Sequence, residues 1–567
     1  MTQLSPSGPL GQETDSFPKP GLSSVLVPIV VAVTGHRDLR PEDSDQLQRA
    51  TADCFRRLKA LYPASPIRLL SGLAEGADRL VARVALNESI ELAAVLPMEA
   101  AEYERDFDSK ASVDEFRRLM AQAHAIYVVQ SSEDVNLDRT THYARLGYFL
   151  VEHCDLLLAL WDGEPSDKRG GTADVVCYRL NGGPRSSIRS GSYLIQYTGD
   201  VYHIATPRAS RRELGPPTSE ARILVPGNST AKPASQWQPE STCLAIDQLN
   251  RDLRADAQHS APQPLAEPLQ GQRTEISSAE TARFRAIDRL AIRFQTRTWR
   301  AFAWMLTLSL LALICLQRRG IDGRWSVPLT VLYVTFMIAA YGIYFWSKRM
   351  KLENRAFDYR AVAEGLRIQQ AWRVAGLAER AADHYLGRQQ GVLKWVRRAL
   401  LNWDWPLPDA QQSDRVSRES MERALEDWVV DQRQFFGRSL TRQRRSHQLY
   451  VRAANVLVWL GFALSMLKSP QGWTAWLISL AAIPPMVAAT LLVYAKTRAW
   501  SEQVNQYATM RDLYQTAEDH LRALLRENDL KGAQELLVEL GQEALSENAE
   551  WLSIHRRRAI RSPDLGM

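Results

Sequence analysis

The sequence contains few of the features that mark secreted or metal-dependent proteins. Its 567 residues include only five cysteines, an odd number with no C-x-x-C spacing, which argues against a disulfide framework and favours a reducing, cytosol-facing location. The Ser-, Pro- and Gly-rich residues 1–27 lack the basic and apolar regions of a secretory signal, so we expect a disordered lead-in. No G-x-x-x-x-G-K-[ST], H-E-x-x-H or Cys/His cluster occurs, and the sequence therefore predicts neither a Walker-type phosphate loop nor a metal site.

Charge of one sign is not in marked excess either. The 70 basic and 64 acidic residues give a net charge of only +6. A DNA-binding protein usually concentrates basic residues along one face, whereas many of those here flank apolar segments, so no DNA partner is expected. The length exceeds that of one compact core and indicates several units of roughly 150 residues.

Six short apolar runs alternate with helical patterns in the first part of the chain. Each run is continuous, which is typical of strands buried on both faces of a parallel sheet. We therefore expect an α/β fold over residues 28–207, a Rossmann-like, doubly wound parallel sheet that binds ligands beyond the carboxyl ends of its strands. The predicted strands are residues 28–33, 67–70, 92–97, 125–129, 156–161 and 201–204.

Glycine-bearing turns follow three of these runs. T-G-H-R follows the first, S-G-L-A-E-G-A-D the second and W-D-G the fifth, with G-G-T opening the next helix. A strand that turns into a helix directs backbone N–H groups and the positive helix end at one spot, which suits a phosphate. We expect the three turns to converge at one sheet edge. The candidate ligand-binding residues are Gly35, His36, Arg37, Ser71, Gly72, Glu75, Gly76, Asp78, Asp162, Gly163, Gly170, Gly171 and Thr172.

The side chains in these turns suit nucleotide binding. The glycines allow close approach to a diphosphate, and Arg37 can make a charge-assisted contact. Ser71 and Thr172 supply hydroxyl groups, and the carboxylates that can accept from ribose hydroxyls are Glu75, Asp78 and Asp162. The expected ligand is a nucleotide or an NAD or ADP-ribose derivative, with no required cofactor.

His36 is the one residue of the set with an obvious catalytic alternative. A histidine at a strand end is more often a hydrogen-bonded structural residue than a catalyst, and no Ser or Cys near it pairs with it as a nucleophile. We therefore expect no catalytic residue.

The three turns resemble those of the SLOG superfamily. V-T-G-H-R, S-G-L-A-E-G-A-D and W-D-G followed by G-G-T are similar to motifs of this group over residues 28–207. The group includes the cytokinin-activating phosphoribohydrolases called LOG, the DNA-processing protein A family and the ligand-sensing region of melastatin-type TRP channels. The resemblance implies a Rossmann-like domain that binds a nucleotide or an NAD-derived signal.

The sequence departs from the enzymes of that group. LOG-type hydrolases carry P-G-G-x-G-T-x-x-E, and aligning Gly171 and Thr172 on the G-T pair places Val175 where the catalytic glutamate belongs. Asp174 is one position early, and Arg169 replaces a glycine. Hydrolysis of an N-glycosidic bond, with Asp174, Glu75 or His36 as acid or base, is therefore the alternative and not the first expectation.

Four charge-free stretches follow a segment rich in Pro, Ser and Gln, residues 208–278, which we expect to be a flexible linker in which residues 242–246 could form one short ordered element. A membrane span needs about 20 apolar residues, and the stretches are continuous and edged with Trp and Tyr, unlike the striped helices of a soluble bundle. We expect four spans in two hairpins, with a kink at Pro484 and Pro485. The stretches are residues 301–316, 325–346, 453–467 and 469–495.

Basic residues predict the orientation of these spans. They cluster before the first and third stretches and after the second and fourth, and the connecting turns carry fewer. The positive-inside rule then places both turns outside and the termini and the α/β domain in the cytoplasm. We expect a multi-pass protein of the cell (inner) membrane.

The two hairpins read as a repeat of one two-span unit. Each has a basic helix, a short span, a longer span and a charged helix with Glu and Tyr. The expected units are residues 279–390, 391–440 and 441–567. Residues 392–401 form a basic amphipathic helix that either lies in the headgroup layer or packs as an ordinary helix, and the helix after Trp500 has the spacing for packing against a partner helix, which makes a homo-oligomer plausible.

The paired hairpins with charged cytoplasmic helices are similar to SLATT-type effector modules. In bacteria these modules accompany SLOG or nucleotide-synthase partners in predicted antiviral defence systems. The resemblance implies a sensor domain that controls a pore-forming or membrane-disrupting module. The alternatives are a membrane-tethered nucleotide or NAD hydrolase and a scaffold with a degenerate pocket.

Overall fold

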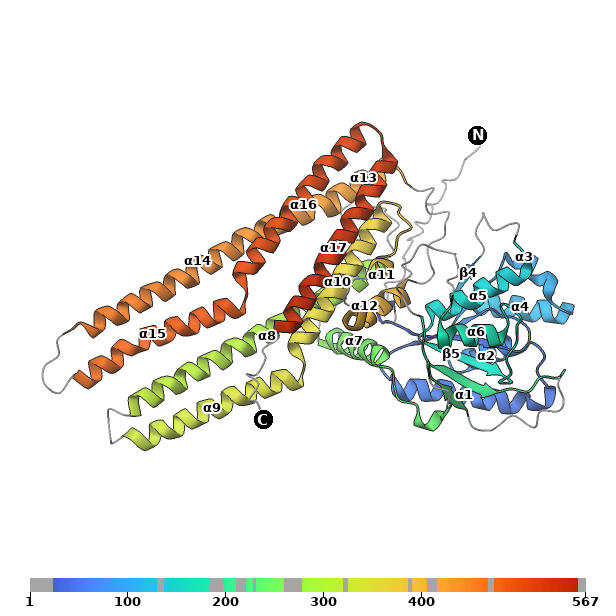
Figure 1. The fold of residues 1–567 in the computed structure, drawn as a ribbon, viewed down its shortest axis with the longest axis horizontal. Helices are drawn as coiled ribbons and strands as arrows, with labels where there is room; N and C mark the ends of the chain where they lie inside the picture. Colours follow the sequence, from blue (N-terminus) through green and yellow to red (C-terminus); the bar gives the residue numbers. More distant parts are fainter. Residues whose placement is uncertain are drawn as a thin grey trace, which may run out of the picture.

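The chain folds into an α/β domain and a region of long paired helices (Figure 1). The structure is a computed structural model. It describes residues 24–129, 137–183, 197–210, 221–227, 231–259, 278–319, 325–385, 390–404, 416–467 and 474–558.

The α/β domain contains the predicted doubly wound sheet. Its strand order is β4-β3-β2-β1-β5-β6-β7-β8, and the first six strands of the chain are parallel. All six coincide with predicted runs to within three residues, so the parallel sheet is confirmed. The order reverses between β1 and β5, which is the switch point where such sheets bind ligands. The parallel strands are β1 (Ile29–Gly35), β2 (Ile67–Ser71), β3 (Glu91–Leu96), β4 (Ala125–Val128), β5 (Leu156–Trp161) and β6 (Val201–Ala205).

Helices cover both faces of the sheet because successive strand residues point to opposite sides. Val31 and Val33 of β1 belong to the core under one set of helices, and Val30 and Ala32 belong to the core under the other. The first set is α1 (Ser44–Leu61), α2 (Ala77–Asn87) and α4 (Lys110–Gln122), with the short α3 (Ala100–Tyr103) beside them; the second is α5 (Arg139–His153) and α6 (Thr172–Asn181).

The predicted flexible linker, residues 208–278, is wrong over residues 221–259. Residues there form the antiparallel strands β7 (Arg222–Leu224) and β8 (Lys232–Pro233) and the helix α7 (Ser241–His259). Asp247 of α7 accepts the N–H of Ala64 at 2.8 Å, and Asn250 accepts the N–H of Val27 at 2.8 Å. These buried bonds fix α7 to the sheet, so this part of the segment belongs to the α/β domain. Residues 260–277 lie outside the described residues.

Within the described part of the helical region, three segments are long and apolar enough to cross a membrane: Ala279–Arg319, Ser326–Val374 and Leu480–Arg526. They overlap the first, second and fourth predicted stretches. The third, residues 453–467, is not among them, because α14 ends at Ser465, soon after its apolar part begins. Four spans are therefore not confirmed. The helices are α8 (Ser278–Arg319), α9 (Ser326–Arg349), α10 (Leu352–Val374), α11 (Ala381–His384), α12 (Gln390–Trp403), α13 (Arg418–Ala424), α14 (Asp431–Ser465), α15 (Thr474–Thr497), α16 (Trp500–Arg526) and α17 (Leu530–Arg558), with a π-helical turn (Leu425–Val430) before α14.

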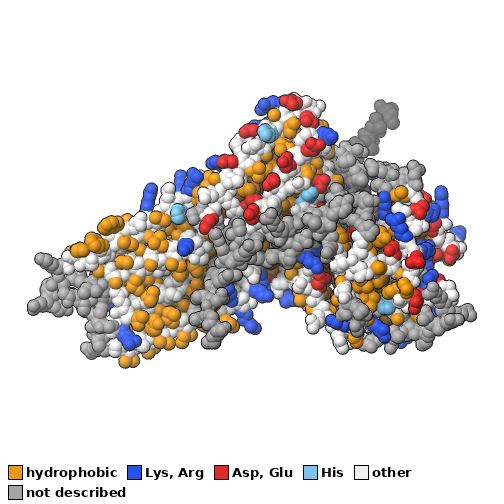
Figure 2. All heavy atoms as spheres, in the orientation of Figure 1, with side chains coloured by type: hydrophobic (Ala, Val, Ile, Leu, Met, Phe, Trp, Pro, Cys, Tyr) orange, Lys and Arg blue, Asp and Glu red, His pale blue; other side chains and the backbone are white. Residues whose placement is uncertain are grey.

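Large apolar side chains cover the outer surface of the helix pairs α8/α9 and α14/α15 (Figure 2). Trp304, Ile338 and Trp459 are each more than 60% exposed. Monomeric soluble proteins rarely expose apolar surface of this extent, so this surface suits a lipid environment. Helix α15 continues through Pro484 and Pro485, and the kink stays a prediction.

Helices α9 and α10 repeat as α15 and α16 at a constant offset of 148 residues. Helix α9 begins at Ser326 and α15 at Thr474, and each is 24 residues long. One left-handed residue follows each of them, Lys351 (φ 49°) and Ala499 (φ 52°), and α10 and α16 then start at the next position. A shared break at a non-glycine residue, which is costly at positive φ, supports the predicted duplication.

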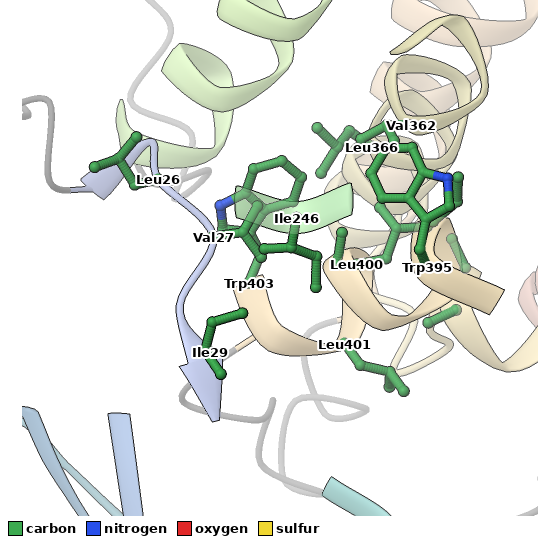
Figure 3. Close-up of a cluster of buried hydrophobic side chains, with 14 of the residues drawn as sticks. Leu26, Val27, Ile29, Ile246, Val362, Leu366, Trp395, Leu400, Leu401 and Trp403 are labelled. Carbon is green, nitrogen blue, oxygen red and sulfur yellow. The ribbon is translucent and has the colours of Figure 1, made fainter. Parts of the chain in front are cut away.

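Helix α12 joins the two regions and does not lie exposed as a headgroup-layer helix would. Figure 3 shows Trp403 beside Val27 and Ile246, and Trp395 beside α10 residues. The indole N–H of Trp403 donates to the Val25 carbonyl at 3.1 Å. Of the two placements left open for residues 392–401, the ordinary packed helix is confirmed and the membrane-surface helix is wrong, because the apolar face is covered by protein.

A buried polar network also fastens α12 to the sheet. Asp155, at the amino end of β5, accepts the N–H of Val30 at 2.7 Å and the side-chain amide of Asn402 at 2.8 Å. Its other oxygen pairs with Arg398 at 2.5 Å. The amino ends of β1 and β5 therefore face the helical region, and the carboxyl ends face away from it.

Candidate functional site

The loops after β1, β2 and β5 meet at the carboxyl edge of the sheet, as predicted. The N–H of Ala77 donates to the His36 carbonyl at 3.0 Å, and the N–H of Asp162 donates to the His36 ring nitrogen Nε2 at 3.0 Å. A Cβ on Gly76 would lie 2.3 Å from the Arg37 carbonyl oxygen, so only glycine (φ 80°) permits this approach. The β1 loop is thus fastened to both of its neighbours.

His36 is a structural link in this arrangement. Its Nε2 accepts a backbone N–H, which assigns the proton of the neutral ring to Nδ1. Burial lowers the pKa of His36, although the Asp162 carboxylate 3.2 Å away opposes this. A neutral ring whose Nε2 is already bonded is a poor general base, in line with the structural interpretation.

Asp78 is a buried carboxyl group within the site. It lies in the first turn of α2, where its Oδ2 accepts the N–H of Ala74 at 3.4 Å. Burial raises the pKa of Asp78 to about 7, although the charge of Arg37 works against the shift. Carboxyl groups with such pKa values gather at functional sites, and this one changes charge near neutral pH.

Arg37 presents an exposed cation beside Asp78. Its guanidinium lies 5.0 Å from the ring centroid of Tyr143, whose hydroxyl donates to Asp106. Arg139 also pairs with Asp106, at 2.8 Å. Tyr143, Asp106 and Arg139 were not predicted from the sequence, because we considered glycine-bearing turns and none follows β4. Their positions were the available signal: Asp106 lies in the segment after β3, and Arg139 and Tyr143 lie near the start of α5.

Two residues predicted to contact the ligand, Ser71 and Glu75, instead form hydrogen bonds within the protein. The Ser71 hydroxyl is fully buried and accepts the N–H of Leu73 at 3.1 Å. Glu75 accepts from the Ser112 hydroxyl and from the N–H of Asp108 at 3.2 Å, so its carboxylate is held by the segment before and within α4. A Cβ on Gly72 would lie 2.9 Å from the Leu146 side chain, whose end would have to shift to make room for it.

The turn that opens α6 is also internally bonded. Asp174 accepts the N–H of Gly170 at 2.7 Å and the hydroxyl of Tyr148 at 3.0 Å. Gly170 (φ 73°) lies against the backbone of Ala144. Gly171 caps α6, which begins at Thr172, and Gly163 (φ 88°) is exposed on the β5 loop. Asp174 is thus occupied in holding the turn and α5 together.

Among the described residues, no group of three His, Cys, Asp or Glu side chains can hold a metal ion. Comparison with protein-family models gives no match, and comparison with curated proteins gives none. The resemblance to SLOG and SLATT proteins therefore stays a prediction.

Proposed function

We propose that the chain is a membrane-anchored sensor and effector whose α/β domain binds a nucleotide or an NAD- or ADP-ribose-derived signal. The observation that supports this best is the meeting of three loops around Arg37 and Asp78 at the switch point of a doubly wound sheet. Backbone N–H groups near the start of α2 suit a phosphate, and Arg37 is placed to add a charge-assisted contact.

The bound signal acts on the membrane helices through the sheet. β1 carries ligand-binding residues at its carboxyl end and the Val30–Asp155 bond at its amino end, and seven strand residues span about 20 Å. Asp155 in turn holds Arg398 and Asn402 of α12. A ligand can shift the helical region only by the difference in its affinity for two states, about 1–3 kcal/mol for usual couplings.

The helical region is the effector in this proposal. Four spans in two hairpins cross the cell (inner) membrane, with both termini and the α/β domain in the cytoplasm, and homo-oligomers open a pore or disrupt the bilayer. A SLATT-like role in bacterial defence fits this arrangement. The hydrolase alternative is less favourable, because the side chains of His36 and Asp174 are already engaged in holding loops.

Calorimetric titration of the full chain in detergent with cyclic nucleotides, ADP-ribose and NAD tests the proposal. At least one compound should bind, and Arg37→Gln should weaken it about tenfold or more, since bonds to charged groups contribute roughly 1.5–3 kcal/mol. The matched control is Arg49→Gln on α1, which is exposed and lies in another element. Absence of binding by the folded chain would contradict the proposal, and release of free base would favour the hydrolase.

A further inference from the structure

A cavity of about 1,390 Å³ lies between the helix pairs, away from the sheet. Helices α8, α9 and α10 line one side, and α14 to α17 line the other (Figure 1). Both left-handed breaks, Lys351 and Ala499, are in its wall, so it sits where the apolar helices give way to the charged ones. The volume exceeds the roughly 300–1,000 Å³ of ordinary small-molecule pockets.

One end of the cavity is apolar. All three segments capable of spanning a membrane contribute to it, through Phe302 and Met305 of α8, Ile343 of α9 and Val493 of α15. This end lies within the part of the helices that suits lipid, and its wall therefore suits hydrocarbon chains.

Cations gather where the apolar helices end. Lys348 lies in the last turn of α9 and Lys351 just after it, and Lys496 lies in the last turn of α15 and Arg498 just after it. Arg498 is held in place, with its guanidinium 4.1 Å from the Trp299 ring centroid. Basic and aromatic residues at this depth face the headgroups of the cytosolic leaflet.

Basic side chains outnumber carboxylates in the wall of the cavity. Six are basic (Lys348, Lys351, Arg360, Arg442, Lys496 and Arg498) and four are acidic (Glu353, Glu364, Glu502 and Glu547). Glu364, further along α10, is bonded to Arg360 at 2.5 Å and to Arg367 at 3.1 Å. Glu547 is bonded to Gln506. Positive charge therefore remains next to the apolar end.

We infer that this cavity binds an acidic phospholipid of the cytosolic leaflet. The phosphate lies among Lys351, Lys496 and Arg498, and the acyl chains lie against α8, α9 and α15. Because the two halves of the repeat each supply a wall, the lipid bridges them at their breaks. This site is separate from the sheet edge, and its failure would leave the proposed sensor function untouched.

The test uses the full chain in nanodiscs of phosphatidylcholine with or without phosphatidylglycerol of the same acyl chains. Native mass spectrometry measures retained lipid. Wild type should retain phosphatidylglycerol selectively, and Lys496→Gln and Lys351→Asn should each lower that retention about fivefold, from roughly 1 kcal/mol per cation near an anionic surface. Asn suits the left-handed position 351, and Lys531→Gln on the exposed face of α17 is the charge-matched control.

A photoactivatable phosphatidylglycerol gives a second measurement on the unaltered protein. Cross-links should map to the cavity walls on α8, α9, α15 and the start of α16. Equal retention of the two lipids, or cross-links elsewhere only, would overturn the inference. Cross-links between two copies of the chain at these walls would assign the cavity to an oligomer interface instead. Equal stabilisation by glycerol phosphate alone would assign it to a free phosphate. Either result would overturn the inference that a phospholipid occupies the cavity.

Discussion

Replacing Asp78 by Asn tests the physical picture of the sheet edge. The pKa of Asp78 is about 7 in the folded chain, against about 4 in an unfolded one. The native state therefore keeps its proton to about pH 7, whereas the unfolded state releases it near pH 4. The contribution of Asp78 to the free energy of unfolding is largest below about pH 4, falls as the pH rises to 7 and changes little at higher pH. Three units of pKa correspond to roughly 4 kcal/mol, of which about 2 kcal/mol is lost between pH 5 and pH 7.

Native-state hydrogen exchange of peptides from β1 and β2, corrected for intrinsic rates at each pH, measures this slope on the full chain in detergent. Asp78→Asn keeps a neutral acceptor and should abolish most of the slope, with greater stability than wild type above pH 7. Asp45→Asn, at an exposed position of α1, leaves Asp78 intact and should keep the wild-type slope. Equal slopes in wild type and Asp78→Asn would refute the reasoning.

Two matched pairs test the loops and the interface by urea unfolding. Gly76→Ala should lower the free energy of unfolding by more than about 2 kcal/mol, because it adds a steric clash to a strained φ; Gly163→Ala, with nothing within 4 Å of its Cβ, should cost only about 1 kcal/mol. Equal costs would show that the loops are not pressed together. Asp155→Ala should cost about 3–5 kcal/mol, because it leaves the buried Arg398 unpaired, whereas Glu422→Ala in an exposed pair should cost less than about 1 kcal/mol. A small loss for Asp155→Ala would mean that α12 is not fixed to the sheet.

The strands and the meeting of the turns were predictable because continuous apolar runs and strand-glycine-helix turns are local signals. The directions in which the side chains point could not be predicted. Ser71 and Glu75 have suitable chemistry for a ligand, but the left-handed Leu73 and the distant Ser112 turn them to structural bonds. Only the folded loops show that Arg37 stays exposed while Asp78 is buried beside it.

The packing of α7 was mispredicted, and the placement of α12 was left open, for a related reason. Asp247 gives α7 a polar residue at a buried position, and its partner Ala64 lies 183 positions away. Helix α12 has the same basic and aromatic pattern on a membrane surface as on a protein surface, and the partner of Arg398, Asp155, lies 243 positions away. Local periodicity contains no information on such partners.

Hydrogen exchange of the full chain with and without ADP-ribose, NAD and cyclic nucleotides tests the central claim most directly. A binding compound should protect residues 34–38, 71–78 and 161–172 together and should also change the exchange of α12, on the opposite edge of the sheet. Protection of one loop alone, or of none by any compound, would contradict a shared site. Protection of all three with no change in α12 would contradict its coupling to the membrane helices.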